Sequence, residues 1–243
     1  MIDLHCHLLP DIDDGPDTLD MAVSMAKMAL EDGIHHSVLT PHITPGRFNN
    51  QQRDIEKAGM KYRSHLAEQG IELGLSFAAE VRLDPVILTL QSSGQLPYLG
   101  QYQGKNVVLL EMPHGQVPPG ATQLVSWLIE RDVLPMIAHP ERNRDVWYKP
   151  AKLQPLLDQG CLVQITAGSL LGQFRQESYQ RACELLQDGL VNCIATDAHN
   201  LSSRPPKLAG AVAKAAELVG EAQAKAMVLD FPQSLLSQRV RGV

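Results

Sequence analysis

Several features that would place a protein in a common class are scarce or absent in this chain of 243 residues. It has no uninterrupted apolar run long enough for a membrane-spanning helix. Its first residues show neither a basic segment nor the apolar stretch and cleavage site of a secretory signal. Positive charge is not in surplus, because 21 Lys and Arg residues stand against 27 Asp and Glu residues. We therefore expect a cytoplasmic protein that neither inserts into a membrane nor binds nucleic acid.

Cysteine is also scarce, and its four positions show no C-x-x-C pair. Two of these cysteines, Cys161 and Cys193, lie in apolar, strand-like runs. This pattern is typical of reduced cysteines that pack as small apolar side chains inside a cytoplasmic protein.

Predicted strands and helices alternate along the chain. Apolar runs predict strands at residues 2–4, 37–40, 73–79, 107–110, 134–138, 161–166 and 191–196. Helical spacing of apolar residues fills several of the intervals, and Asp-Gly or Gln-Gly pairs repeatedly precede a strand, as expected where helices end. This alternation favours a closed parallel barrel with helices outside, and a doubly wound open sheet is the alternative. No Pro- or Gly-rich linker divides the chain, so we expect one domain over residues 1–243.

Nearly every predicted strand is followed by an imidazole or a carboxylate. The carboxyl ends of barrel strands share one face, where residues distant in sequence meet. The first strand leads into His5 and His7, whose spacing places both on one side of an extended chain. The later strands lead to His42, Glu80, Glu111, His139, Asp197 and His199, and only the strand ending at Thr166 offers no such residue. Imidazole and carboxylate ligands without thiolate suit zinc, manganese or iron(II).

The remaining histidines do not follow this pattern. They lie in a helix–strand connection, within a helix or in a loop, and are His35, His36, His65 and His114. We expect these four to face solvent or to surround the site without binding metal.

The order of these motifs resembles the polymerase-and-histidinol-phosphatase (PHP) superfamily. The motifs are H-x-H at 5–7, Asp-Asp-Gly at 13–15, Pro-His at 41–42, Ala-Glu at 79–80, Leu-Glu at 110–111, Ala-His-Pro-Glu-Arg at 138–142 and Thr-Asp-Ala-His at 196–199. Within that superfamily the chain is similar, up to about Pro206, to the manganese-dependent tyrosine-protein phosphatases of bacterial capsule and exopolysaccharide clusters. The resemblance implies an α/β fold, a distorted seven-stranded (β/α)7 TIM-like barrel that holds three divalent metal ions.

The resemblance also implies the ligands of each ion. The first ion would be bound by His5, His7, Glu80 and Asp197. The second would be bound by Glu80 (as a bridge), Glu111 and His139. The third would be bound by Asp14, His42 and His199, with Asp13 as the alternative to Asp14. Mn²⁺ is the expected ion, with Fe²⁺, Zn²⁺ and Mg²⁺ as alternatives, because other branches of the superfamily carry His in place of Glu111.

Phosphate recognition would fall to two arginines, Arg142 and Arg204, because planar guanidinium groups match phosphate oxygens. Three divalent ions bring a charge of about +6 and four carboxylates about −4, so a bridging hydroxide leaves about +1. A site of that sign favours a dianionic phosphate monoester. Two aromatic loop residues, Phe48 and Tyr148, are candidates to stack on a substrate ring.

Two other phosphatase chemistries do not fit the sequence. A cysteine-based phosphatase needs an arginine after five intervening residues, but Ile12, Ala167, Gly189 and His199 occupy those positions. An aspartyl-phosphate mechanism needs Asp-x-Asp at the end of an apolar strand. Residues 11–13 instead follow a proline and precede Asp14-Gly15.

Three functions remain open. The first is a metal-dependent protein-tyrosine phosphatase that uses metal-activated hydroxide and regulates a bacterial tyrosine kinase of capsular or exopolysaccharide synthesis. The second is a small-molecule phosphatase of the histidinol phosphate type, and the third is a metal-stabilised interaction module without turnover. The complete set of candidate ligands disfavours the third. Short connections after strands, such as the one expected at 196–199, favour an open cleft and a protein substrate.

Overall fold

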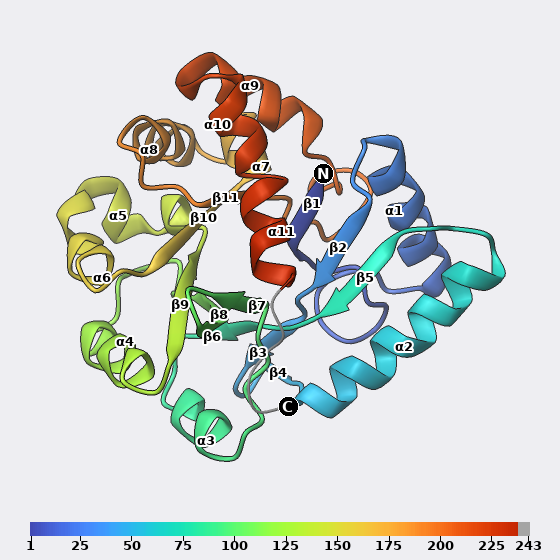
Figure 1. The fold of residues 1–243 in the computed structure, drawn as a ribbon, viewed down its shortest axis with the longest axis horizontal. Coiled ribbons are helices and arrows are strands. Elements are labelled where there is room, and N and C mark those ends of the chain that lie inside the picture. The colour runs from blue at the N-terminus through green and yellow to red at the C-terminus, as the bar shows by residue number, and fades with distance from the viewer. Residues whose placement is uncertain (238–243) are drawn as a thin grey trace.

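Two sheets curve around a common centre in the computed structural model, which describes residues 1–237 (Figure 1). The first sheet is parallel and has the order β1 (Ile2–Cys6), β2 (His36–Leu39), β5 (Gly74–Phe77). The second has the order β11 (Cys193–Ala195), β10 (Leu162–Thr166), β9 (Val133–Ala138), β8 (Lys105–Glu111), β6 (Glu80–Arg82), β3 (His42–Thr44), β4 (Phe48–Asn49). A further strand, β7 (Gly100–Tyr102), pairs antiparallel with the start of β8.

The two sheets join into a closed barrel. On one side, β2 is separated from β3, and β5 from β6, by only two residues, so each pair acts as one interrupted strand. On the other side, β1 meets the residues after β11 through a parallel bridge between Cys6 and Ala198. The His7 amide donates to the Ala198 carbonyl at 2.8 Å, and the Asp197 amide donates to the His5 carbonyl at 2.8 Å. The expected seven-stranded barrel is confirmed, and the open doubly wound sheet is wrong.

The helices lie outside the barrel (Figure 1). They are α1 (Leu19–Glu31), α2 (Gln52–Glu68), α3 (Val86–Ser92), α4 (Ala121–Ile129), α5 (Arg144–Tyr148), α6 (Gln154–Leu157), α7 (Ala167–Leu170), α8 (Gln176–Gln187), α9 (Ala209–Val219), α10 (Glu221–Ala226) and α11 (Asp230–Leu236), with 3₁₀ turns at Pro140–Arg142 and Pro150–Lys152. The sequence next to α1 explains where this helix begins and ends. The Thr18 hydroxyl accepts a hydrogen bond from the Met21 amide at 3.2 Å and caps the start, and Gly33, with φ of 89°, follows the end. None of the helices within residues 1–237 is long and apolar enough to cross a membrane.

Strand residues alternate between two apolar layers. In β8, Val108 and Leu110 pack in the outer layer beneath the helices, whereas Val107 and Leu109 belong to a second cluster inside the barrel. Glu111 continues the inward series and lies in the cleft at the carboxyl end of the strand. The apolar interior therefore ends where the polar site begins.

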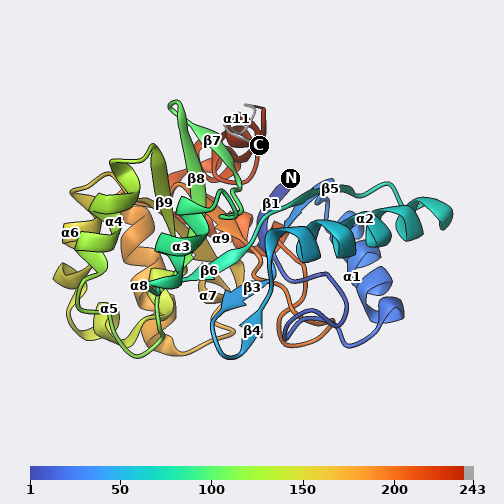
Figure 2. The same ribbon diagram turned by 90° about the horizontal axis from the view of Figure 1, so that it is seen from below.

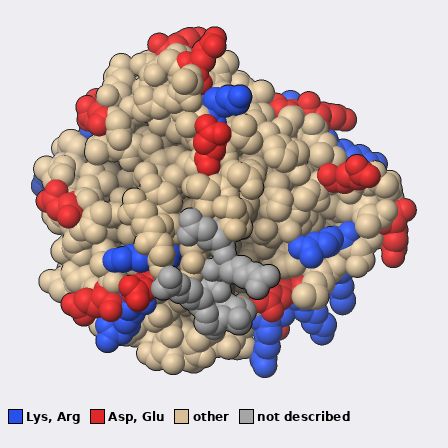
Figure 3. Space-filling view, in the orientation of Figure 1, with Lys and Arg blue, Asp and Glu red and all other residues tan. Residues whose placement is uncertain are grey.

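The last described helix, α11, closes the opposite end of the barrel. Leu235 is fully buried in the interior cluster, and the Phe231 ring lies 5.3 Å from the Tyr102 ring. In Figure 2, α11 and β7 lie at the top of the view, whereas β3 and β4 lie at the bottom. Figure 3 shows the face on which α11 lies, where charged side chains of both signs are scattered. Access to the polar end of the barrel is therefore from the other face.

We expect Gly100→Ala to destabilise the protein, because α11 packs directly on this glycine. A Cβ atom at position 100 would lie 2.2 Å from the carbonyl oxygen of Leu235, so the helix backbone would have to move. The free energy of unfolding, measured by urea denaturation, should fall by about 1–3 kcal/mol.

The matched control is Gly210→Ala in α9, where the nearest atom would be Leu171 Cδ2 at an ordinary 3.5 Å. That variant should keep the native stability or gain up to about 1 kcal/mol from helix propensity. Equal denaturation midpoints for the two variants would contradict the close packing of α11 on β7.

Candidate metal centre

An irregularity in β1 brings the first two histidines into the site. Ile2 and Leu4 belong to the barrel interior, so strict alternation would also turn Cys6 inward. The β1–β2 register shifts between Asp3 and Cys6, and Cys6 packs in the outer layer. His5 and His7 therefore converge, with their Nε2 atoms 3.2 Å apart. The H-x-H spacing predicted that the two side chains would share a side, but the bulge decides which side.

The predicted ligands converge at the carboxyl end of the barrel in three groups whose ligand atoms lie within 4.8 Å of one another. The groups are His5, His7, Glu80 and Asp197; His42, Glu80 and Glu111; and His7, Asp14, His42 and His199. Glu80 belongs to two of these groups. His139 lies outside the groups but contacts them, because its Nε2 is 2.7 Å from Glu80 Oε1.

Two of these residues adopt a backbone conformation that favours glycine. His139 has φ of 34° and ψ of 54°, and Asp197 has φ of 51°. Each residue follows immediately or closely after a barrel strand, where the chain turns sharply to leave the sheet. Strain of this kind is of order 1–3 kcal/mol per residue and persists only where the surroundings enforce it. The turn directs both side chains towards the centre.

Outer hydrogen bonds orient the imidazoles. Gln164 Oε1 lies 2.9 Å from His5 Nδ1, and Asp13 Oδ2 lies 2.6 Å from His7 Nδ1. These contacts leave the Nε2 atoms facing the centre, the arrangement in which outer partners hold metal-binding histidines. Asp13 thus orients His7, whereas Asp14 Oδ1 lies 3.3 Å from the Nε2 atoms of both His42 and His199.

Two supporting residues were missed by the sequence reasoning. Gln164 is fully buried in β10, the strand that offered no ligand. In the sequence, the available signal was a polar amide side chain within an otherwise apolar run. Glu141 is also fully buried and accepts from the Thr166 amide at 2.9 Å and the Ser169 hydroxyl at 2.8 Å. It ties the segment that carries His139 and Arg142 to the end of β10.

The carboxylates of the site do not share one electrostatic environment. Burial opposes the charge of Glu80, but His5 and His42 outweigh it and hold the pKa of Glu80 well below its usual range. Burial likewise opposes the charge of Asp197, whose pKa Arg204 and His5 hold well below its usual range. For Glu111, burial and the neighbouring charge of Glu80 raise the pKa to about 7. Glu111, unlike Glu80 and Asp197, is therefore short of neighbouring positive charge.

Two imidazoles are held neutral. Burial and the charge of Arg142 lower the pKa of His139 to about 3. Burial and the charge of His7 lower the pKa of His199 to about 4. Neutral imidazole is the form that binds a metal ion.

Several buried polar atoms of the site lack a hydrogen bond within residues 1–237. They are His42 Nδ1, Glu80 Oε2, Glu111 Oε2, Asp197 Oδ1 and His199 Nε2. Their nearest polar neighbours belong to the same group, as with His42 Nδ1 and Glu80 Oε2 at 3.0 Å. Buried polar atoms that lack hydrogen bonds are rare in proteins and costly. Lone pairs of carboxylate and imidazole that face one another fit divalent cations, which satisfy them together. The residues present therefore fit a metal centre.

The two predicted phosphate-binding arginines both reach this centre. Arg142 Nη1 and Arg204 Nη2 donate to the same atom, Asp197 Oδ2. A third arginine, Arg82, was not predicted and lies 3.4 Å from Glu111 Oε2. All three line a small cleft of about 100 Å³.

The rim of the cleft comes mainly from the hairpin of β3 and β4. Thr44, Arg47 and Phe48 line it there, and the Phe48 ring is stacked on His42 with a centroid distance of 5.5 Å. Tyr148, the other aromatic candidate, is 72% exposed and does not line the cleft. His114 does line it, as expected for a histidine that surrounds the site.

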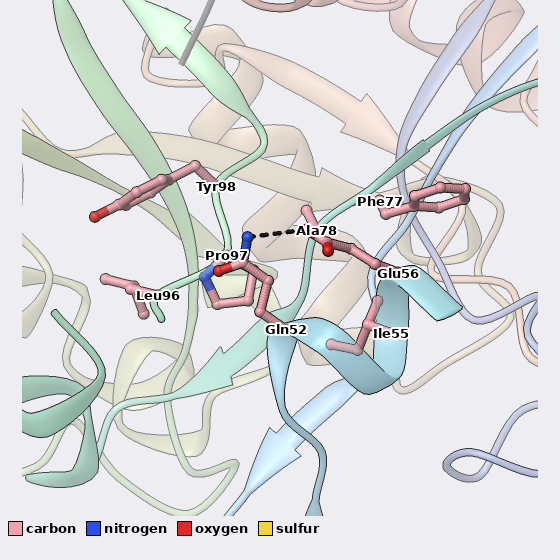
Figure 4. Close-up of a pocket in the computed structure, with 8 residues that line it drawn as sticks. All are labelled: Gln52, Ile55, Glu56, Phe77, Ala78, Leu96, Pro97 and Tyr98. Atoms are coloured by element: carbon pink, nitrogen blue, oxygen red, sulfur yellow. Dashed lines mark hydrogen bonds between the residues drawn. The ribbon is translucent and has the colours of Figure 1, made fainter. Parts of the chain in front are cut away.

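A separate cavity of about 170 Å³ lies between the start of α2 and residues 96–98 (Figure 4). Gln52 Nε2 donates to Glu56 Oε1 there at 2.9 Å. Of the described part of the chain, Glu56 is the only acidic or basic residue that lines this cavity, so the cavity has no group of ligands there comparable to the metal centre.

The chain is similar to known proteins over most of its length. The sequence model of the family described as capsular polysaccharide synthesis, CpsB/CapC, matches residues 1–237. Tyrosine-protein phosphatase YwqE of Bacillus subtilis is 33% identical over 204 residues, which are 84% of this chain and 79% of that protein. Tyrosine-protein phosphatase CpsB of Streptococcus pneumoniae is 26% identical over 246 residues, which are 99% of this chain and 100% of that protein.

Solved structures show the same fold. A structure from work on YwqE and CpsB, described as unique metal-dependent tyrosine phosphatases, superposes with a TM-score of 0.90 at 30% identity and covers 99% of this chain and 96% of that chain. An organophosphorus hydrolase variant from Deinococcus radiodurans shares only the fold, with a TM-score of 0.58 at 15% identity over 97% of this chain and 92% of that chain. Because the family's sequence model spans nearly the whole chain, this protein belongs to the CpsB/CapC family of capsular polysaccharide synthesis.

Proposed function

We propose that this protein is a metal-dependent protein-tyrosine phosphatase that acts in capsular polysaccharide synthesis. The observation that carries the proposal is the group of buried carboxylates and imidazoles, several of whose facing atoms lack a hydrogen bond within residues 1–237, beside a cleft lined by arginines. The relatives YwqE and CpsB are named as tyrosine-protein phosphatases, and the report of their crystal structures describes both proteins as metal-dependent. The single metallophosphatase domain would comprise residues 1–243.

We assign three divalent ions, with Mn²⁺ as the favoured metal, to the converging side chains. One would be held by His5, His7, Glu80 and Asp197, one by Glu80, Glu111 and His139, and one by Asp14, His42 and His199. Such ions, when bound, supply a hydroxide nucleophile and stabilise charge on phosphoryl oxygens. The assignment of His139 rests on its contact with Glu80, and that of Asp14 on its contacts with His42 and His199.

The chain's own contribution to phosphate binding would come from Arg142 and Arg204. Their guanidinium groups are held at the cleft by Asp197, so they are positioned before a substrate arrives. Only 14% of the Arg142 side chain and 24% of the Arg204 side chain are exposed. Partly buried guanidinium groups bind phosphate oxygens more strongly than solvated ones, because water competes less.

The depth of the site supports a phosphotyrosine substrate. Glu80 lines the cleft and is fully buried, as are His5 and His7, which lie 3.3 Å from it, and the hairpin of β3 and β4 stands at the rim. A phosphate carried on a tyrosine ring extends further from the peptide backbone than one on serine, so it can reach the floor. Phe48 at the rim can pack against the ring and contribute about 0.5–1.5 kcal/mol. We propose a bacterial tyrosine kinase of polysaccharide synthesis as the substrate protein.

The connection after β11 is longer than the sequence predicted. The connection expected to be short at residues 196–199 runs from β11 to α9 over residues 196–208. The Asn200 side chain accepts hydrogen bonds from the backbone amides of Ser202, Ser203 and Arg204, and these bonds hold the segment in a tight turn. Loop length therefore does not distinguish a protein substrate from a small phosphate ester, and the choice depends on the substrate experiment below.

Glu80→Gln should lower both metal content and phosphatase activity, because Glu80 contacts two groups of candidate ligands. We expect activity on a phosphotyrosine peptide to fall by about 100-fold or more. Metal content, measured by mass spectrometry of the purified protein, should fall with it. Glu130→Gln is the control, since this residue follows the last residue of α4, its side chain is 72% exposed and it does not line the cleft. A Glu80→Gln variant with native metal content and activity would remove the proposed centre.

Arg142→Ala and Arg204→Ala should separate phosphate binding from metal binding. Each variant should keep its metal and lose about 2–4 kcal/mol of transition-state stabilisation, seen as a lower kcat/KM. The control is Arg131→Ala. Arg131 lies just before the amino end of β9, away from the cleft, and its guanidinium packs on Trp127 of α4. Metal loss in the arginine variants as large as in Glu80→Gln would contradict this division of roles.

Phosphotyrosine and phosphoserine peptides of one sequence should differ strongly as substrates. We expect kcat/KM to be higher for phosphotyrosine by about 100-fold, because the serine phosphate does not reach the floor of the cleft. Both are measured on protein loaded with the same metal, with histidinol phosphate as the third substrate. Similar constants for the two peptides, or faster turnover of histidinol phosphate, would favour the small-molecule phosphatase instead.

A further inference from the structure

A second cavity adjoins the catalytic cleft. It has a volume of about 290 Å³ and shares His114 and Arg142 with the cleft, so the two adjoin at these side chains. Its other walls come from α5 and from the start of α8, and they are Arg144, Trp147, Phe174, Arg175 and Ser178. A peptide that leaves the cleft over Arg142 would enter this cavity.

Among residues 1–237, the cavity is lined by three arginines and by no carboxylate, although the whole chain has a net charge of −6. The nearby cations are mostly paired: Arg142 with Asp197, Lys152 with Asp145, and Arg181 with Glu184. Arg144 and Arg175 are exposed and make no ion pair within residues 1–237. Two free guanidinium groups therefore flank the route out of the cleft.

The walls that carry these arginines are held in place. Trp147 Nε1 donates to the Glu141 carbonyl at 2.6 Å, and Arg181 donates to the Trp147 carbonyl at 2.9 Å. On the other side, the Arg142 guanidinium lies 4.6 Å from the centre of the Phe174 ring. Arg175 immediately precedes α8, and no side chain caps the first turn of that helix. The partial positive charge at this helix end adds to that of the arginines.

We propose that this cavity is a specificity subsite that binds an acidic side chain flanking the phosphotyrosine of a peptide substrate, through Arg144 and Arg175. The inference rests on the proposed phosphatase function and adds the sequence context of the substrate. Guanidinium groups bind carboxylates in paired hydrogen bonds, and the indole and phenyl walls shield those bonds from water. The subsite is separate from the metal centre, because neither Arg144 nor Arg175 lines the catalytic cleft.

The test compares phosphotyrosine peptides that differ only in flanking charge. One series carries three Glu residues on the amino side of the phosphotyrosine, one carries them on the carboxyl side, and matched peptides carry Ala or Lys. For the native protein, kcat/KM should be about tenfold higher for at least one Glu peptide than for its Ala counterpart, and lower for the Lys peptide. Phenyl phosphate, which has no flanking residues, reports the metal centre alone.

The double variant Arg144→Glu/Arg175→Glu should reverse this preference and favour the Lys peptide. Arg131→Glu, at the amino end of β9, changes the net charge by the same amount per site and should keep the preference for Glu. The inference is overturned if the native protein treats all flanking charges alike, or if the double variant keeps the native preference. An equal loss on phenyl phosphate and on every peptide would also overturn it, since that result places the arginines in support of the metal centre.

Failure of the proposed function gives a different result. In that case the native, metal-loaded protein would hydrolyse none of the phosphotyrosine peptides, and the subsite would have no substrate to select. Turnover of the peptides without any effect of flanking charge would keep the phosphatase and remove only the subsite.

Discussion

The structure depends on placing several carboxylates and imidazoles together at the open, carboxyl end of an apolar barrel. Such charges are costly to bury unless they are paired. The chain supplies part of the compensation itself, since Arg142 and Arg204 both donate to Asp197 and Arg82 approaches Glu111. The compensation is incomplete around Glu80 and Glu111, where buried oxygens keep no hydrogen bond among residues 1–237. A site built in this way favours cations, and it can accept an anionic substrate only after the cations have offset the negative charge.

The scaffold restricts both the geometry of this site and the route to it. The outer hydrogen bonds from Gln164 and Asp13, and the unusual backbone conformations of His139 and Asp197, hold the side chains where they converge. The apolar interior and α11 close the other end of the barrel. A substrate must therefore approach from the carboxyl ends of the strands, past the hairpin of β3 and β4 and past the arginines beside α5 and α8.

Much of the fold and of the site could be predicted from the sequence, because strand-end positions carry a repeated chemical signal. The order of imidazoles and carboxylates indicated which side chains would meet, and the structure brings them together. Other features depend on tertiary contacts that no local pattern reports. The bulge in β1, the two residues that interrupt the strand before Glu80, and the role of Gln164 follow from pairing with distant strands. The length of the connection after β11 was mispredicted because Asn200 folds it through local hydrogen bonds.

The seam between β1 and the residues after β11 also has a consequence for biosynthesis. Asp3 accepts hydrogen bonds from the amide and hydroxyl of Thr196, and His5 pairs through its backbone with Asp197. The strand that is synthesised first, β1, therefore cannot pair along this edge until the residues after β11, the last strand, have been synthesised. During that interval its histidines lack Asp197, so their group of ligands is completed only after translation of most of the chain. Cellular supply of the ion would then affect how much of the newly made protein matures, and not only how fast the finished enzyme turns over.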